Sequence, residues 1–309
     1  MNLLDVENLW VKFPTRSGVF DAVRGVSFSI GQERLGIVGE SGSGKSMTGR
    51  AILRLIRPPG IMTADRIAIE GDDIMAMNQR QIRAVRGQRI SMIMQDPKFS
   101  LNPVMTVGAQ IMEAYALHAR ASKAQTKAKA LEMLKAVLIR DPERVFRAYP
   151  HEMSGGMGQR IMIAMMMIPD PKILIADEPT SALDVSVQGQ VLGIMDRLVQ
   201  ERGMGLIFIS HDLNLVSSFC DRVLIMYAGR IVETCEANRL HEATHPYTRG
   251  LLNSLPRLGE RKDRLEVLKR DAAWREAPSV SGAESVSGAQ SVSGAQNISE
   301  APLQPGSKV

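Results

Sequence analysis

The sequence predicts an α/β fold, and three observations lead to this prediction. Short apolar runs typical of buried strands recur along the chain, and segments with helical spacing lie between them. A glycine-rich loop follows the first run, and polar side chains end the later ones. The runs cover residues 35–38, 90–94, 172–176 and 205–209. Because ligands bind at the carboxyl ends of strands in such sheets, the residues after each run are candidates for a functional site.

The segment before residue 39 is predicted to consist of strands. Residues 3–6 begin the first strand, a turn extends from Pro14 to Gly18, and residues 22–30 alternate between apolar and polar side chains. These strands lead directly into the glycine-rich loop.

The loop at residues 39–46 has the sequence GESGSGKS and matches the phosphate-binding pattern G-x-x-x-x-G-K-[ST]. In such a loop, backbone N–H groups surround phosphate oxygens and the following helix adds its positive dipole end. Lys45 would reach the outer phosphates, and Ser46 would hold a magnesium ion. The expected phosphate-binding residues are Gly39, Glu40, Ser41, Gly42, Ser43, Gly44, Lys45 and Ser46. The loop predicts nucleotide binding but not what the phosphate energy drives.

An aromatic side chain near such a loop can stack on a nucleotide base. Phe13 lies beside the turn that starts at Pro14, so we expect it to stack on the base. The alternative, that Phe13 covers the edge of a strand, stays open.

Helical spacing extends from Lys45 to Ile56 and stops at residues 57–60, where two prolines and a glycine end any helix. Residues 66–69 are expected to form a strand and residues 80–86 a helix. The pattern over residues 106–145 is helical, which indicates a helical block inserted into the α/β domain. Its basic run at 118–129 lacks interleaved aromatic residues, so a solvated helix face is favoured over a nucleic-acid patch.

Four polar side chains follow the later apolar runs. Gln95 ends the run at 90–94, and its amide can contact both a metal ion and a water. Asp177 and Glu178 follow the run at 172–176. Because successive side chains of a strand point to opposite faces, the two carboxylates cannot share one task. We expect Asp177 to hold magnesium and Glu178 to orient or deprotonate a water. His211 follows residues 205–210, where an imidazole can hydrogen-bond a transferring phosphoryl group.

A second phosphate-binding element is predicted at the start of the helix that continues to Ile168. The helix opens with Ser154, Gly155 and Gly156. A hydroxyl, uncovered N–H groups and the helix dipole together bind anions, so these three residues are the expected ligands.

Composition excludes several classes of protein. The net charge of +5 permits an anionic partner without arguing for one. Cys220 and Cys235 are too few and too isolated for a disulfide framework or a cysteine-ligated cluster. Asp5 and Glu7 interrupt the apolar core that a signal peptide needs, and no apolar run is long enough to span a membrane. We therefore expect a cytoplasmic protein, unless a partner holds it at a membrane.

These motifs, in this order and at this spacing, resemble the nucleotide-binding subunits of ATP-binding-cassette (ABC) transporters over roughly residues 1–260. The family's Walker A loop falls on residues 39–46 and its Q-loop glutamine on Gln95. Its Walker B aspartate and catalytic glutamate fall on Asp177 and Glu178. The resemblance implies a P-loop NTPase core with an antiparallel β subdomain and an inserted helical subdomain at about residues 96–168.

The remaining motifs of the family also have counterparts. Its signature falls on residues 154–157, its D-loop on residues 181–184, its switch histidine on His211 and its adenine-stacking aromatic on Phe13. The signature is usually LSGGQ and here is MSGGM, which keeps the serine and both glycines and has Met157 in place of the glutamine.

The resemblance implies hydrolysis of ATP with Mg²⁺ by a dimer. In this family each ATP lies between the Walker A loop of one subunit and the signature of another. A heterodimer with a related ATPase is favoured over a homodimer. Residues 96–97, 100–103 and 245–252 resemble the oligopeptide, dipeptide and nickel importer branch.

Membership of that branch would make the chain the ATPase of a peptide importer. Two membrane permease subunits and a periplasmic substrate-binding protein would be its partners, with no nucleic acid. It would act at the cytoplasmic face of the inner membrane. Nickel import is the main alternative, and a soluble cassette ATPase acting on nucleic acid or ribosomes is the alternative from another class.

The expected organisation is an ATPase domain at residues 1–256, a C-terminal extension at 257–276 and a tail at 277–309. From Ser279 onward the tail repeats Ser-Val-Ser-Gly-Ala-Glu or Ser-Val-Ser-Gly-Ala-Gln three times with a period of six residues, and these repeats lack large apolar residues. It is therefore predicted to be disordered and dispensable.

Overall fold

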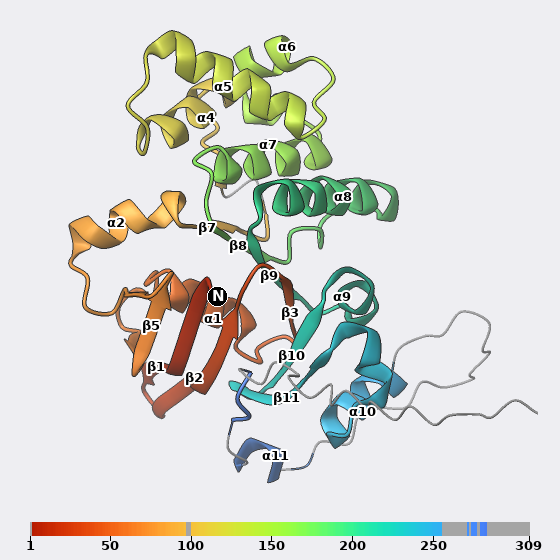
Figure 1. The fold of residues 1–309 in the computed structure, drawn as a ribbon. Coiled ribbons are helices and arrows are strands. Elements are labelled where there is room, and N and C mark those ends of the chain that lie inside the picture. Colours follow the sequence, from red (N-terminus) through yellow and green to blue (C-terminus); the bar gives the residue numbers. More distant parts are fainter. Residues whose placement is uncertain (1, 97–99, 255–270, 272, 277–278, 283–309) are drawn as a thin grey trace, which may run out of the picture.

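The computed structural model describes residues 2–96, 100–254, 271, 273–276 and 279–282. Figure 1 shows a central sheet, a second sheet packed beside it from the N-terminal strands, and a group of helices above both. The α/β prediction with an inserted helical block is confirmed.

The central sheet has six strands in the order β11-β10-β3-β9-β8-β7. All neighbours in it are parallel except β10 and β11, which pair antiparallel. Its strands are β3 (Arg34–Val38), β7 (Ile90–Ile93), β8 (Ile173–Asp177), β9 (Gly205–Ser210), β10 (Arg222–Tyr227) and β11 (Arg230–Glu236). The four predicted runs are therefore β3, β7, β8 and β9, and their carboxyl ends meet at one edge.

The N-terminal sheet is antiparallel throughout. It consists of β1 (Leu4–Thr15), β2 (Gly18–Ile30), β4 (Ile61–Thr63), β5 (Arg66–Ile69) and β6 (Asp72–Asp73). The turn between β1 and β2 is tighter than predicted, because Pro14 and Thr15 still pair with Val19 and Gly18.

Helix α1 (Lys45–Ile52) lies between the two sheets, and its buried Ile52 shares a core with Val6 of β1 and Ile175 of β8. The helix ends four residues before the predicted Ile56. Its last turn is closed by Arg86, which donates to the carbonyl oxygens of Leu53 and Arg54. A side chain from α2 (Gln79–Gln88), and not the prolines, therefore meets the free end of α1.

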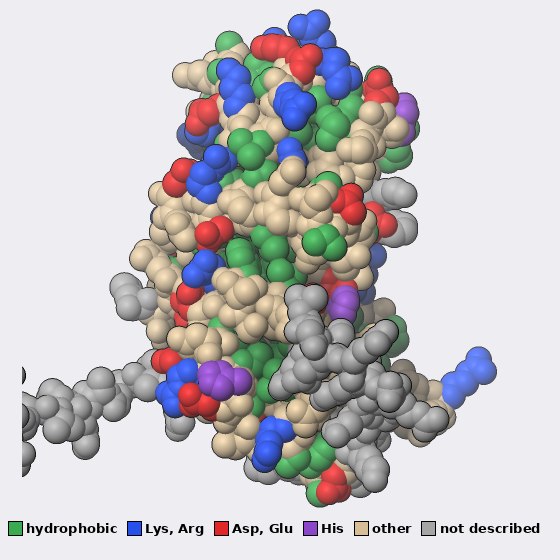
Figure 2. Space-filling model, turned by 90° about the vertical axis from the view of Figure 1, so that its right-hand side faces the viewer, with side chains coloured by type: hydrophobic (Ala, Val, Ile, Leu, Met, Phe, Trp, Pro, Cys, Tyr) green, Lys and Arg blue, Asp and Glu red, His purple; other side chains and the backbone are tan. Residues whose placement is uncertain are grey.

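In its described residues the inserted block contains helices α4, α5 and α6, followed by the helix that Ser154 caps. Its exposed Lys123 and Lys127 lie on α5, and Figure 2 shows basic and acidic side chains intermixed over this region. This arrangement agrees with a solvated face.

In the described part of the chain, the α-helices that follow β7 include those of the inserted block and those after it. They are α4 (Val107–Ala116), α5 (Lys123–Ala136), α6 (Pro142–Arg147), α7 (Gly155–Met167), α8 (Val185–Arg202), α9 (Leu213–Phe219), α10 (Pro246–Asn253) and α11 (Ala273–Glu276).

Within the part of the chain that the structure describes, no helix combines the length and apolarity needed to cross a membrane. Most of the predicted extension (257–276) and tail (277–309) lies outside the described residues. Residues 279–282 are described, and they hydrogen-bond to two strands: Gly282 N to Ser27 O of β2 and Val280 N to Ile231 O of β11, both at 2.8 Å.

Candidate functional site

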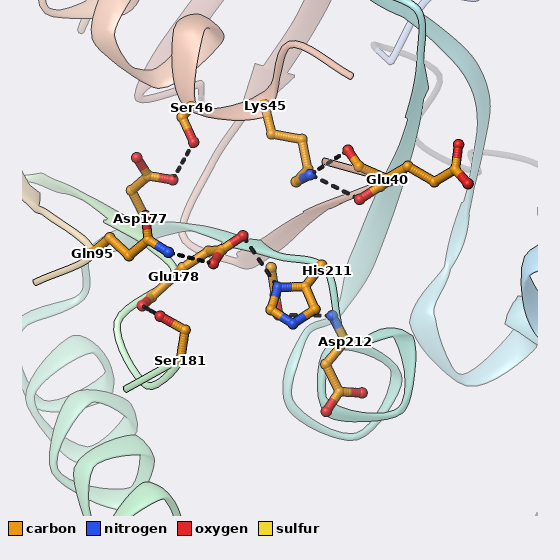
Figure 3. Close-up of polar contacts among 11 residues, drawn as sticks. Glu40, Lys45, Ser46, Gln95, Asp177, Glu178, Ser181, His211 and Asp212 are labelled. Carbon is orange, nitrogen blue, oxygen red and sulfur yellow. Dashed lines mark hydrogen bonds and ion pairs between the residues drawn. The ribbon is translucent and has the colours of Figure 1, made fainter. Parts of the chain in front are cut away.

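The carboxyl edge of the central sheet brings together the residues that were predicted separately (Figure 3). Strand β3 leads into the phosphate loop (residues 39–46), and Gln95 follows β7. Asp177 ends β8, Glu178 follows it, and His211 follows β9. Parallel pairing places these strand ends side by side, which is why residues far apart in sequence form one site.

The phosphate loop is fixed by close contacts with neighbouring strands. Gly39 has a φ of 152°, and a Cβ there would lie 2.1 Å from the carbonyl oxygen of Met226 in β10. Gly44 has a φ of 102°, and a Cβ there would lie 2.5 Å from the carbonyl oxygen of Ala22 in β2. Only glycine fits both positions, because any other residue would need strained backbone and displaced strands.

Lys45 points into the phosphate loop. Its Nζ donates to the carbonyl oxygens of Gly39 at 2.8 Å and of Glu40 at 2.9 Å. Burial lowers the pKa of Lys45, and the carboxylates of Glu178 and Asp177 oppose that shift. The ammonium group is thus held inside the loop, close to where the loop's N–H groups would surround phosphate oxygens.

Ser46 and Asp177 form a hydrogen-bonded pair, in which Ser46 Oγ donates to Asp177 Oδ1 at 2.7 Å. Asp177 is only 3% exposed, and burial raises its pKa. A divalent cation would stabilise this buried carboxylate. Oxygen atoms from Ser46, Asp177 and the Gln95 amide are the ligand type that Mg²⁺ prefers, so these residues fit the predicted metal.

Glu178 is held from both sides. Its Oε2 accepts from Gln95 Nε2 at 3.0 Å, and its Oε1 lies 3.2 Å from His211 Nδ1. The backbone of Glu178 has a φ of 47°, and its N–H donates to Ile209 O at 2.9 Å. With its carboxylate oriented and still partly open to solvent, Glu178 can accept a proton from a water.

Phe13 is partly buried and lies opposite Phe20 across the β1–β2 hairpin. Together with Met47 and Arg50 of α1 it lines a hollow of about 450 Å³. It also packs so closely on Gly60 that a Cβ there would lie 2.7 Å from Phe13 Cε1. Both the stacking role and the strand-cover role are compatible with this position, so base stacking stays a prediction.

The second phosphate-binding element lies apart from the first. Ser154 caps α7 by accepting from Met157 N at 3.4 Å, and a Cβ on Gly156 would lie 2.6 Å from a Val187 methyl carbon of α8. Ser154 and Gly155 line a hollow of about 590 Å³ that also contacts Gln95, and among the described residues its lining includes none of positions 39–46. In the described part of the chain, this hollow is therefore separate from the phosphate loop.

Tyr247 contacts the phosphate loop although no sequence motif indicates it. Its hydroxyl accepts a hydrogen bond from Glu40 N of the phosphate loop at 3.1 Å, and its side chain is fully buried. The segment around it was recognised only as a feature of the importer branch, and no local pattern indicated a contact 207 positions away.

Comparisons with known families match two regions of the chain. The profile described as ABC transporter matches residues 23–181. The profile described as the C-terminal region of oligopeptide/dipeptide transporters matches residues 232–282.

Curated relatives match over most of their own length. A probable peptide ABC transporter ATP-binding protein of Sinorhizobium fredii is 51% identical over 82% of this chain and 77% of its own. The oligopeptide transport ATP-binding protein OppD of Bacillus subtilis is 48% identical, covering 83% of this chain and 72% of its own. The dipeptide transport ATP-binding protein DppD of Escherichia coli is 45% identical, covering 87% and 83%.

Solved structures share the fold. The dimeric structure of a bacterial ABC transporter cassette superposes with a TM-score of 0.68 at 25% identity, covering 76% of this chain and 98% of that one. The post-hydrolysis dimer of a cassette bound to ADP and Pi gives a TM-score of 0.67 at 24% identity, with the same coverage.

Proposed function

The chain belongs to the ATP-binding subunits of ABC transporters, in the oligopeptide/dipeptide branch, and from that premise we propose that it drives the uptake of peptides through membrane permease subunits. The chain is an ATPase of this family. Its contribution to transport is the coupling of ATP binding and hydrolysis to movement of those partners.

The observation that supports the proposal most is the position of Glu178 between Gln95 and His211. The carboxylate is oriented by both neighbours and lies beside the Ser46–Asp177 pair. In the proposed reaction Glu178 orients the attacking water and accepts its proton, and His211 hydrogen-bonds the transferring phosphoryl group. Gln95 would contact both that water and the metal.

The phosphates of ATP are proposed to occupy the phosphate loop. Lys45 and the backbone N–H groups of the loop other than that of Glu40, which donates to Tyr247, bind the phosphate oxygens. Lys45 Nζ has three N–H donors, and the one that its contacts with the Gly39 and Glu40 carbonyls leave free is directed to the outer phosphates. Ser46, Asp177 and Gln95 would hold Mg²⁺, which neutralises charge on the phosphates when it is bound. Phe13 is proposed to stack on the base.

A dimer is proposed as the active unit. The hollow lined by Ser154 and Gly155 supports this, because none of residues 39–46 is among its lining residues, and we infer that the start of α7 meets an ATP bound to another subunit. That terminus would then stabilise the γ-phosphate of the partner's ATP. A related ATPase is the proposed partner, with a homodimer as the alternative.

Peptides are the proposed cargo because the relatives compared above are named for peptides, oligopeptides or dipeptides. Two permeases and a periplasmic substrate-binding protein would complete the transporter, with this chain at the cytoplasmic face of the inner membrane. The helical block over residues 96–168 would pass the motion of the ATPase to the permeases.

The experiment is to co-express the chain with candidate permeases and purify the assembly in proteoliposomes. Peptide-loaded binding protein should stimulate ATP hydrolysis. Stimulation by nickel-loaded binding protein would show that nickel, and not peptide, is the cargo. Stimulation of the purified chain by DNA or ribosomes would show that the protein is a soluble ATPase and not a transporter subunit.

A further inference from the structure

Tyr247 lies beneath the phosphate loop at the start of α10. Its side chain is wholly buried, and its hydroxyl accepts the Glu40 N–H at 3.1 Å. That N–H is therefore directed away from the space where phosphates would bind. Tyr247, a residue of the C-terminal region, thus holds the backbone peptide unit between Gly39 and Glu40 at the start of the phosphate loop.

The peptide unit between Gly39 and Glu40 is held at both ends. Its N–H donates to Tyr247, and its carbonyl oxygen accepts from Lys45 Nζ at 2.8 Å. The N–H and C=O of a trans peptide point in opposite directions, so fixing one end fixes the other. The hydroxyl of Tyr247 consequently sets the direction of the carbonyl that places the Lys45 ammonium group.

Tyr247 is itself held rigidly by the residues before it. Glu233 Oε1 accepts from the backbone N of Thr244 at 2.6 Å and of His245 at 3.1 Å. His245 Nδ1 then accepts from Tyr247 N at 3.2 Å and caps α10. Burial lowers the pKa of His245, which favours the neutral ring that can accept this bond.

Aromatic rings fix the other side of Tyr247. Its ring centroid lies 4.5 Å from that of Tyr227, the last residue of β10. The ring of Trp274 in α11 lies 6.2 Å from Tyr247 and 5.9 Å from His245. The hydroxyl is therefore held in one position in the folded protein. The loss of conformational entropy on orienting it occurs during folding and does not weaken ATP binding.

We propose that Tyr247 is a positioning residue for ATP binding: it orients the Gly39–Glu40 peptide and through it Lys45. The C-terminal region, through Tyr247, then preorganises the phosphate loop. The C-terminal region therefore contributes to the affinity of the chain for ATP. This inference rests on the proposed assignment of residues 39–46 as the ATP phosphate site.

The test is the Tyr247→Phe variant of the full-length chain, which removes one oxygen atom and keeps the buried ring. We expect the Kd for MgATP to rise by about 2- to 12-fold, the range that matches loss of one hydrogen bond of ~0.5–1.5 kcal/mol. The kcat at saturating MgATP in the assembled complex should stay within about twofold, because no reacting atom contacts Tyr247. Amide exchange in the peptide containing Glu40 should quicken.

Tyr227→Phe is the matched control, because it belongs to the same ring cluster and among the described residues its hydroxyl makes no hydrogen bond to the loop. It should leave the Kd and the exchange of Glu40 unchanged. Equal MgATP affinity in wild type and Tyr247→Phe, or a loss of unfolding temperature with no change in Kd, would overturn the inference. If wild type itself bound no MgATP, the assignment of the ATP site would fail instead.

Discussion

Replacement of Glu178 by glutamine should separate ATP binding from hydrolysis. The amide has nearly the same shape, so its oxygen can still accept from Gln95 Nε2 and its nitrogen can face His211 Nδ1. The fold and the phosphate loop are therefore preserved. What is lost is the proton acceptor, and general-base catalysis contributes about 10²–10⁴-fold to rate, so we expect kcat to fall by at least about 10².

The assay is steady-state release of phosphate at saturating MgATP by the assembled complex, with the Kd for ATP measured on the same preparation. We expect the Kd to stay within about twofold, because the glutamine retains the neighbouring contacts. Glu201→Gln is the control, since Glu201 is exposed on α8 and its one polar contact among the described residues is a 3.9 Å ion pair with Arg197. A wild-type rate in Glu178→Gln would refute the assignment of Glu178 as the group that activates water.

Three further predictions concern stability. Burial raises the pKa of Asp177, so the stability that this group contributes is present at low pH and is lost as pH rises through that pKa. Asp177→Asn should therefore raise the unfolding temperature of the nucleotide-free chain increasingly with pH while abolishing Mg²⁺-dependent stabilisation by ATP; an unfolding temperature below wild type at neutral pH would contradict this. Gly39→Ala should destabilise the fold by about 1–3 kcal/mol through backbone strain, with additional cost from the contact on β10, whereas Gly193→Ala, at an open position on α8, should stabilise it by about 1 kcal/mol, both measured by denaturant unfolding. Truncation after Gly282 should leave the unfolding temperature unchanged, whereas truncation after Arg270 should lower it, because bonds to β2 and β11 that each contribute about 0.5–1.5 kcal/mol are removed; equal values for the two truncations would show that these bonds contribute nothing.

The sequence predicted the parts of the fold that depend on local patterns. Four apolar runs became β3, β7, β8 and β9, because strands buried on both faces are apolar throughout. Gln95, Glu178 and His211 could be placed in one site in advance, since the carboxyl ends of parallel strands share one edge.

Features that depend on distant contacts could not be predicted in this way. The end of α1 is set by Arg86, which lies more than thirty positions further along the chain. The hydrogen bond between Tyr247 and Glu40 joins residues 207 positions apart. Residues 279–282 hydrogen-bond to β2 near the start of the chain and to β11 near the end of the central sheet. Composition predicted a dispensable tail from Ala277 onward, but composition carries no information about partner strands.

We propose that ATP bound to the phosphate loop is hydrolysed only when Ser154 of another subunit completes the site. The most direct measurement is the ATPase rate per chain over a wide range of protein concentrations, with light scattering at each point, for the chain alone and mixed with its partner ATPase. We expect the rate per chain to follow the dimer fraction and to fall to background as dimers dissociate. An unchanged rate per chain in samples that scatter as monomers would contradict it.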